Sequence, residues 1–362
     1  MDLAWTFLFE LCEVIMEELL KYEIDKNIFY CPLTLNNNIV KEQPGRGGVG
    51  IQIEDKMVMS VFYSISEDRD NNYILDFYDI EKLSITNEDL HKLFRANNIA
   101  LYFSKNFYEQ KLKGNNVIET SFTEYRDEKG YFIYNNMSEA LKSYLETSFK
   151  EEKDIIKKIH TYIYIRFFIE EIDKYNHIYD MSDLKYLESS NVYINYYINI
   201  KALFLHPNYM YFLINDLVKQ IKASFDDLEK TCLLGVSNNG IILSRLLAYQ
   251  LHLDAKGINH LGPRYCLDDD NEFIKELKNK KFILVSDVIC LGGEYRLAKG
   301  ILNVLNSKLL GAVCVVKIRD IYRNEERKRN DKIFALVDDI NTYEIDGKKI
   351  DYKIYVDKEK SI

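Results

Sequence analysis

The sequence has little proline, and its cysteines are not grouped in the way that metal sites require. Only 4 Pro occur in 362 residues, while Lys, Ile, Asn and Tyr are abundant, which indicates a compositional habit rather than a chemical function. No CxxC pair and no Cys/His cluster with zinc-ligand spacing is present. Two of the cysteines lie in apolar runs that read as buried strands. We therefore expect buried, reduced thiols in a cytosolic protein at the six positions Cys12, Cys31, Cys232, Cys266, Cys290 and Cys314.

Long apolar runs are also missing. No segment reaches the roughly 18 uncharged apolar residues that a membrane span needs. The N-terminus begins with Asp2, and acidic residues from Glu10 onward interrupt its apolar run, so it does not read as a signal peptide. We expect a cytoplasmic protein with no membrane partner.

The sequence also lacks an excess of positive charge. The formal net charge is -9, which argues against non-specific nucleic-acid binding because the phosphate backbone needs a positive face. A local basic patch stays open. Apolar residues make up 47% of the chain, with 28 Tyr and 19 Phe, which is enough for a sizeable core. The length predicts about two domains.

The N-terminal half mixes helical and strand patterns and contains no chemical motif. Residues 3–22 have an amphipathic helical pattern. The glycine-rich run at 43–50 lacks the Gly-Lys-Ser/Thr of a phosphate loop, so it predicts a turn. Strands are predicted at 50–53, 57–63, 73–78 and 99–103, a hairpin at 121–125 and 131–134, and helix at 138–176 with a break near 151–154. We expect an α+β domain of unknown role over 1–136 and a helical connector over 137–185.

Residues 186–362 change in character, because apolar strands now alternate with helices. Strands are predicted at 192–200, 231–236, 281–287 and 311–318, and helices at 207–223, 241–251, 271–279 and 295–306. This alternation is typical of an α/β domain with a parallel sheet. Ligands of such sheets bind beyond the carboxyl ends of the strands, so the loops after Val236 and Asp287 are the predicted site.

The stretch Phe282–Glu294 carries the most specific signal. An apolar strand ends in Asp287, and a short loop with Gly292 and Gly293 then leads into a helix. Glycines let the backbone approach an anion, and the first N–H groups of a helix point toward it. An acid at the end of the strand is placed to hydrogen-bond ribose hydroxyls. The pattern predicts a cradle for an anion beside a ribose site.

The same stretch resembles the phosphoribosyltransferase signature of four apolar residues, two acids, two apolar residues and a Thr/Gly-rich loop. Other segments are similar to orotate phosphoribosyltransferases in the same order: Tyr196–Leu203, His206-Pro207, Gly235–Ile241 and Gly311–Val316. The resemblance covers about 135 residues. It implies a phosphoribosyltransferase-like parallel sheet flanked by helices.

The resemblance also implies a ligand and roles for residues. The ligand would be phosphoribosyl pyrophosphate (PRPP) or a nucleotide, with Mg²⁺ as cofactor, and the orotate enzymes suggest a homodimer. Asp287 would be the catalytic and metal-binding residue at the ribose. The candidate ligand-binding residues are Ser237, Asn238, Asn239 and Gly240 for the pyrophosphate, Ser286, Cys290, Leu291, Gly292, Gly293 and Glu294 around the ribose and 5′-phosphate, and His260 and Arg264 from the loop that covers the site.

Several positions depart from the family pattern. Ser286 replaces the first acid, Cys290 and Leu291 replace the two Thr/Ala positions, and Glu294 replaces a Thr or Ser. A carboxylate in the loop would repel a phosphate by about 4 kcal/mol at ~4 Å, unless Glu294 turns outward or pairs with an arginine. Two readings therefore stay open. The domain transfers a phosphoribosyl group to a nitrogen base, or it is a non-catalytic sensor of a nucleotide or PRPP in a regulatory or defence system.

Overall fold

The structure is a computed structural model in which the chain divides into two compact units, Met1–Ile163 and Tyr164–Ile362. It describes residues 20–33, 40–45, 48–54, 59, 61–63, 65, 68, 70–80, 82–84, 88–89, 92, 98–113, 123–126, 129–134, 137–151, 154–175, 184–187, 192–226, 228–258, 272–318, 332–342, 344–345, 348–349, 351–357 and 360–361. Most of the predicted N-terminal helix, up to residue 19, lies outside these residues. No helix within them is long and apolar enough to cross a membrane.

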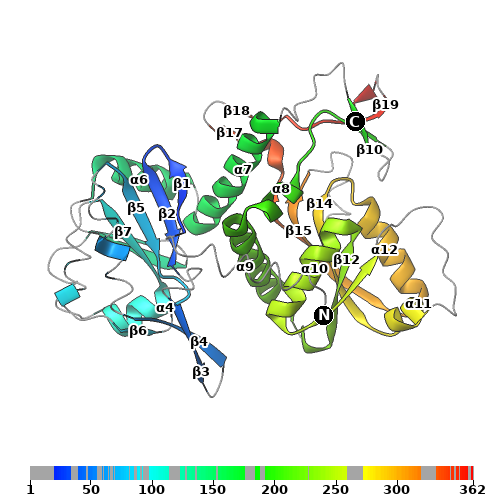
Figure 1. Ribbon diagram of the computed structural model, residues 1–362, viewed down its shortest axis with the longest axis horizontal. Helices are drawn as coiled ribbons and strands as arrows, with labels where there is room; N and C mark the ends of the chain where they lie inside the picture. Colours follow the sequence, from blue (N-terminus) through cyan, green and yellow to red (C-terminus); the bar gives the residue numbers. More distant parts are fainter. Residues whose placement is uncertain are drawn as a thin grey trace. The chain divides into compact units, whose positions relative to one another are not determined.

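Unit 1 is built on a six-stranded mixed sheet (Figure 1). Its order is β1 (Tyr22–Asp25), β2 (Ile28–Pro32), β5 (Asn72–Asp76), β7 (Ile99–Ser104), β9 (Gly130–Tyr134) and β8 (Thr123–Arg126). The central strands β2, β5 and β7 are parallel and the outer pairs are antiparallel. The hairpin predicted across residues 127–130 is confirmed as β8–β9.

Smaller elements complete unit 1. A three-stranded sheet contains β3 (Val40–Gly45), β4 (Gly48–Glu54) and β6 (Lys82–Ser84). The short helix α4 (Lys105–Phe107) continues into the π-helical turn η2 (Tyr108–Leu112). Phe77 and Phe103 stack in the core at a ring-centroid distance of 4.9 Å.

The prediction of a strand at 57–63 is wrong. Where this segment is described, at residue 59 and at 61–63, the chain is helical, and so is Ile65. Met59, Phe62 and Ile65 are buried, whereas Tyr63 is 52% exposed. A three-residue spacing of buried positions fits one face of a helix, and it does not fit the two-residue alternation of a strand.

The predicted long helix does break where expected. It forms α6 (Glu139–Glu151) and α7 (Ile155–Tyr175). Ser138 accepts a hydrogen bond from the Leu141 amide at 3.2 Å, and Asp154 accepts one from the Lys157 amide at 3.1 Å. Each side chain thus caps the first turn of its helix, and the cap at Asp154 is why α7 begins there.

A buried polar group lies at the carboxyl end of β5 in unit 1. The Tyr30 hydroxyl donates to Asp76 and lies 2.8 Å from His160 Nε2. The second Asp76 oxygen accepts from the Tyr78 amide at 2.7 Å. Tyr30 and His160 are 130 residues apart, so no local pattern connects them. Hydrogen bonds of this kind offset the cost of burying Asp76.

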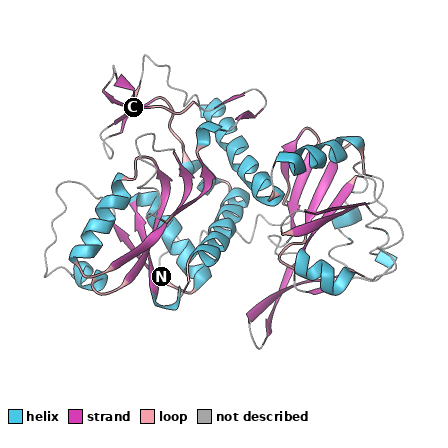
Figure 2. Ribbon diagram, turned by 180° about the vertical axis from the view of Figure 1, so that it is seen from behind, coloured by secondary structure: helices cyan, strands magenta, loops and turns pink. Residues whose placement is uncertain are grey.

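Unit 2 contains a five-stranded, entirely parallel sheet, which confirms the predicted α/β fold class (Figure 2). Its order is β13 (Asp254–Ile258), β12 (Thr231–Val236), β14 (Lys281–Ile289), β15 (Lys308–Lys317) and β16 (Ile333–Asp338). Each middle strand contains a continuous run of buried apolar residues because helices cover both faces of the sheet. These helices are α9 (Pro207–Ser224), α10 (Ser237–Leu251), α11 (Glu272–Leu277) and α12 (Gly293–Val304).

Alternate residues along the strands face the two helix layers. One set of alternate residues, which includes Leu234 and Leu284, packs against α11 and α12. Leu277 of α11 and Leu302 of α12 belong to the same apolar cluster. On the other face, α10 lies so close to the sheet that side chains are excluded at two glycines. A Cβ on Gly240 would lie 2.7 Å from the Val285 carbonyl oxygen, and one on Gly235 would lie 2.5 Å from the Gly240 carbonyl oxygen. The glycines therefore set the position of the first turn of α10.

The strand order reverses direction between β12 and β14. From β12 the chain first crosses to β13 on one side, and then returns to β14 on the other side and continues outward. The loops that leave β12 and β14 therefore run to opposite sides and leave a crevice between them at the carboxyl edge. Such a switch point is where open α/β sheets bind ligands.

A second, antiparallel sheet belongs to unit 2. It consists of β10 (Lys185–Leu187), β11 (Val192–Ile194), β19 (Ile354–Asp357) and β20 (Lys360–Ser361), so the C-terminal segment pairs with the strand before the parallel sheet. The predicted strand 192–200 ends at Ile194, and α8 (Ile200–Leu205) begins at its last residue. The remaining short elements are η4 (Leu228–Lys230), η6 (Ile340–Thr342), β17 (Glu344–Ile345) and β18 (Lys348–Lys349).

Asn195, which follows β11, joins the chain to the C-terminal segment. Its Nδ2 donates to the Asp351 carbonyl, and its Oδ1 accepts from the Lys353 amide, each at 2.6 Å. Its own amide donates to the Lys353 carbonyl at 3.4 Å, so side chain and backbone both bind the segment that precedes β19.

Candidate ligand-binding site

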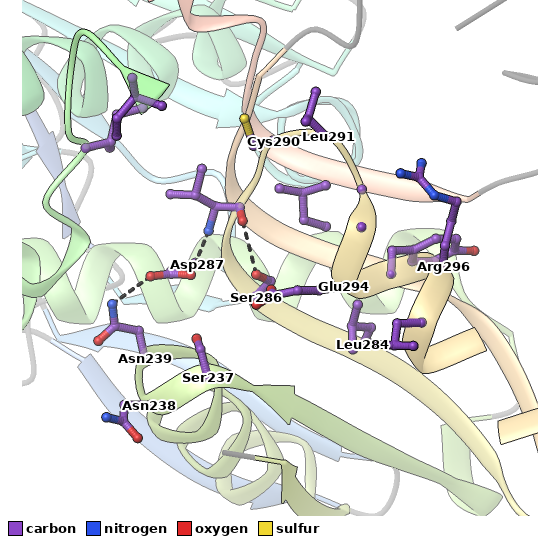
Figure 3. A pocket seen from close by; sticks show the side chains of 18 of the residues that line it. Ser237, Asn238, Asn239, Leu284, Ser286, Asp287, Cys290, Leu291, Glu294 and Arg296 are labelled. Carbon is purple, nitrogen blue, oxygen red and sulfur yellow. Dashed lines mark hydrogen bonds between the residues drawn. The ribbon is translucent and has the colours of Figure 1, made fainter. Parts of the chain in front are cut away.

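A cavity of about 880 Å³ opens at the carboxyl ends of β12 and β14 (Figure 3). Its wall comes from four segments of unit 2: the stretch between β11 and α8, the first turn of α10, the end of β14 with the loop into α12, and Tyr352 before β19. The volume lies within the range of small-molecule sites. The cavity therefore lies at the switch point of the sheet.

Asp287 lines this cavity from the carboxyl-terminal part of β14, two residues before the strand ends at Ile289. One carboxylate oxygen accepts a hydrogen bond from Asn239 Nδ2 at 2.6 Å, and the other accepts from the Val288 amide at 2.9 Å (Figure 3). Asp287 and Asn239 are 48 residues apart, and the parallel pairing of β12 with β14 brings them together. The two bonds fix the carboxylate and leave further lone pairs for a ligand.

The first turn of α10 forms the next part of the wall. Ser237, Asn238 and Asn239 line the cavity. Ser237 has φ 64°, a left-handed backbone conformation that costs a non-glycine residue of order 1–3 kcal/mol and is concentrated at functional sites. Gly240 was a candidate ligand-binding residue, but it does not line the cavity. It is buried against β14, where it allows the close approach of the helix.

The loop from Cys290 to Gly293 ends in a helix N-terminus that faces the cavity. Gly292 is the N-cap of α12 and has φ 67°, a conformation that favours glycine. The Arg296 amide bonds to the Gly292 carbonyl at 3.0 Å. The amides that precede it in the first turn have no acceptor within the helix. The loop therefore offers backbone donors to a ligand, as the sequence predicted for an anion cradle.

Ser286 stands where the signature has its first acid, but it does not offer its side chain to a ligand as that acid would. Its side chain is 1% exposed, and its Oγ donates to the Val288 carbonyl at 3.3 Å. The hydroxyl is thus used within the protein, and Asp287 is the carboxylate that β14 presents to the cavity.

Glu294 supplies a second carboxylate, from the first turn of α12. It lines the cavity, and Figure 3 shows its side chain directed toward Ser286 and Asp287. Burial, and then the charge of Asp287, raise the pKa of Glu294 above its ordinary value of 4.5. Figure 3 shows the Arg296 side chain turned away from it. Among the described residues, Glu294 forms no ion pair with Arg296 or Arg245.

Several lining residues were given no role by the sequence analysis, among them two tyrosines and a lysine from distant segments. Tyr197 and Lys201 come from the stretch before the parallel sheet, and Tyr352 comes from the C-terminal segment. Burial, and then the neighbouring Cys290 thiol and Tyr197, raise the pKa of Tyr352, which also hydrogen-bonds to Cys290. No sequence motif links Tyr352 to the loop 290–294, because tertiary contacts bring the two together. These are the pairing of β11 with β19 and the two hydrogen bonds between the Asn341 side chain and the Tyr352 backbone.

Other predicted site residues lie elsewhere. His260 and Arg264 are outside the described residues. Lys256, a candidate for neutralising a ligand's charge, lies on β13 and forms an ion pair with Glu276. No group of three or more His, Cys, Asp or Glu side chains suited to a metal ion occurs in the described parts of the chain. The carboxylates of the cavity wall are those of Asp287 and Glu294, and Mg²⁺ commonly binds one or two carboxylates together with waters and the phosphate oxygens of a ligand.

Comparisons with known proteins gave structural similarity alone. No protein-family model matches the chain, and a search of curated proteins found no match. Among solved structures, adenine phosphoribosyltransferase from Rhodothermus marinus has 15% identity and a TM-score of 0.33 over 40% of this chain and 86% of that chain. The enzyme from Giardia lamblia, complexed with 9-deazaadenine, has 15% identity and a TM-score of 0.33 over 40% and 87%.

A third similar structure is that of Trypanosoma brucei adenine phosphoribosyltransferase, in complex with AMP, pyrophosphate and ribose-5-phosphate. It has 17% identity and a TM-score of 0.32 over 40% of this chain and 70% of that chain. Scores and identities at this level carry no functional conclusion. None of the comparisons supports the orotate branch in particular, so the cavity itself must carry the functional proposal.

Proposed function

We propose that unit 2 binds a small molecule built on ribose, the class that includes PRPP, nucleotides and nucleosides. The single observation that carries the proposal is the fixed Asp287 carboxylate in a switch-point cavity of about 880 Å³. A ribose carries neighbouring hydroxyls, and both donate well to one carboxylate. Because Asn239 and Val288 already orient Asp287, little side-chain freedom is lost on binding.

The rest of the cavity suits the two ends of such a ligand. The loop from Cys290 to Gly293 and the first turn of α12 would receive the 5′ end through backbone amides. The polar turn at Ser237–Asn239 would receive the substituent at the anomeric carbon. Tyr197 and Tyr352 line the cavity and would pack against a base.

In the enzymatic form of this proposal, the domain transfers a phosphoribosyl group to a nitrogen base, as the resemblance to phosphoribosyltransferases implies. Asp287 would hold the ribose hydroxyls while positive charge develops at the anomeric carbon. Mg²⁺, held by Asp287 together with ligand oxygens, would neutralise the departing pyrophosphate. The polar turn at Ser237–Asn239 would orient that leaving group.

In the second form, the domain binds its ligand without turnover and acts as a sensor. Ser286 favours this form, because its buried hydroxyl takes the place of an acid that the phosphoribosyltransferase signature has at the ribose. The cavity then has one carboxylate fewer at the ribose for metal and ligand, while Asp287 and the backbone donors remain.

Titration of the full chain tests both forms. Isothermal calorimetry measures binding of PRPP with Mg²⁺, nucleotides and nucleosides, and a pyrophosphate-release assay with a panel of bases measures turnover. Asp287→Ala is expected to weaken binding at least tenfold, while Asp226→Ala, a matched change at an exposed acid outside the cavity, leaves it unchanged. Binding without turnover identifies the sensor, and turnover that requires Asp287 identifies the enzyme. Absence of binding by every ribose compound contradicts both.

A further inference from the structure

The first turn of α12 combines hydrogen-bond donors with a negative charge. Gly293, Glu294 and Tyr295 occupy its first three positions, where amides have no acceptor within the helix. The Glu294 carboxylate comes from the same turn and lines the same cavity. In the described part of the chain it makes no hydrogen bond or ion pair, so it is available to a ligand.

Cations near Glu294 do not remove this charge. Lys201 and Arg296 are the cationic residues of the cavity wall. Both are exposed, and Figure 3 shows the Arg296 side chain turned away from the space between Glu294 and Asp287. Both carboxylates line the same cavity, and the charge of Asp287 makes a charge on Glu294 more costly. The inner part of the cavity is therefore negative although backbone donors surround it.

This combination discriminates between the groups that end a riboside at its 5′ carbon. A hydroxyl both accepts and donates, so it can accept from the α12 amides and donate to Glu294. A phosphate monoester dianion only accepts, so it would meet the same amides but would be repelled by both carboxylates. The alcohol can thus form hydrogen bonds with both the amides and the Glu294 carboxylate, whereas the phosphate can bond only to the amides.

We propose that Glu294 is a specificity-determining residue that makes the cavity select ribosides with a free 5′-hydroxyl, that is nucleosides, over their 5′-phosphates. The proposal rests on the proposed function, since it takes the ribose on Asp287 and the 5′ end at α12. It assigns to Glu294 a contact with the ligand.

The space beside this turn is open. A Cβ built on Gly293 would have no atom within 4 Å, and both Gly293 and Glu294 line the cavity. No described side chain therefore fills the space in which a 5′-hydroxymethyl group would lie.

The test compares nucleosides with their 5′-monophosphates by isothermal calorimetry on the full chain, in EDTA and again in Mg²⁺. Four pairs are used, with adenine, guanine, cytosine and uracil as bases, because the base is unidentified. For the wild type, at least one nucleoside is expected to bind tenfold or more tightly than its monophosphate. Glu294→Gln keeps the shape and removes the charge, and is expected to shrink this preference at least tenfold through tighter binding of the monophosphate.

Controls separate this inference from the proposed function. Glu229→Gln removes an exposed carboxylate on η4, outside the cavity, and should leave the preference unchanged. Glu294→Thr is a second variant, in case the amide of Gln makes its own bond to phosphate. A wild-type preference for the monophosphate, with or without Mg²⁺, overturns the inference and leaves the proposed function standing. So does a preference that both Glu294 variants leave intact. Failure of every ligand to bind overturns the proposed function itself.

Discussion

Replacing Asn239 by Asp tests whether the site is built around a single oriented carboxylate. The change is isosteric and turns the donor that lies 2.6 Å from Asp287 into a second acid. At that distance and an effective dielectric constant near 20, two ionised carboxylates repel by about 6 kcal/mol. Protonating one of them at pH 7, from a pKa near 3.9, costs about 4 kcal/mol. Taking up a proton costs less free energy than keeping both charges, so protonation sets the loss of stability.

The expected consequence is a pH-dependent loss of stability in Asn239→Asp. The folded variant binds a proton that its unfolded form releases, so its stability falls as pH rises, by up to about 1.4 kcal/mol per pH unit between pH 4 and 7. The loss relative to wild type should approach about 4 kcal/mol at pH 7 and nearly vanish at pH 4. Asn238→Asp adds the same charge at an exposed neighbour that does not bond to Asp287, and should stay within about 0.5 kcal/mol.

The assay is hydrogen exchange of peptides from β12 and β14 at increasing urea, at pH 4, 5, 6 and 7. It reports the free energy of unfolding of unit 2 separately from unit 1. An equal loss at every pH, or an equal loss in the Asn238→Asp control, would refute the reasoning that Asn239 holds an ionised Asp287.

Three further changes have distinct expected outcomes. Gly240→Ala should destabilise unit 2 by about 1–3 kcal/mol in urea unfolding, since its Cβ meets backbone at 2.7 Å, whereas Gly293→Ala, in open space, should not. Glu294→Gln should raise the melting temperature at pH 7. Because the folded-state pKa is raised, the wild type loses stability as pH rises above about 4.5, so this gain should disappear below that pH. Tyr30→Phe should cost unit 1 about 1–3 kcal/mol by removing a donor to a buried carboxylate, whereas Tyr63→Phe, 52% exposed, should be neutral in the same melt.

The parallel sheet of unit 2 was predictable because burial on both faces leaves a continuous apolar run. Such runs mark β12, β14 and β15, and the glycine pair after β14 marks the turn into α12. Chain order alone then placed the loops after β12 and β14 at the same edge. The sequence therefore predicted that Asp287 and the first turn of α10 belong to the candidate site.

The edge strand β13 escaped prediction, since its sequence Asp-Ala-Lys-Gly-Ile has no apolar run. It is a strand because β12 supplies its hydrogen-bond partners, which is a tertiary effect. The resemblance to orotate phosphoribosyltransferases instead suggested that Lys256 belongs, with His260 and Arg264, to the loop that covers the site.

The direction of the Glu294 side chain could not be predicted either. The sequence left an outward turn and an arginine partner open, and only the packing of α12 against the sheet decides between them. Tyr352 reached the cavity through the pairing of β19 with β11, a contact between segments some 160 residues apart that no local pattern encodes.

A co-crystal structure of the full chain with its tightest-binding ribose compound tests the central claim most directly. The account predicts ribose hydroxyls within about 2.6–3.2 Å of the Asp287 carboxylate, with the Asn239 bond preserved and the 5′ end at the first turn of α12. Ligand density away from the crevice between β12 and β14, or a ligand in that crevice that leaves Asp287 without a new contact, would contradict it.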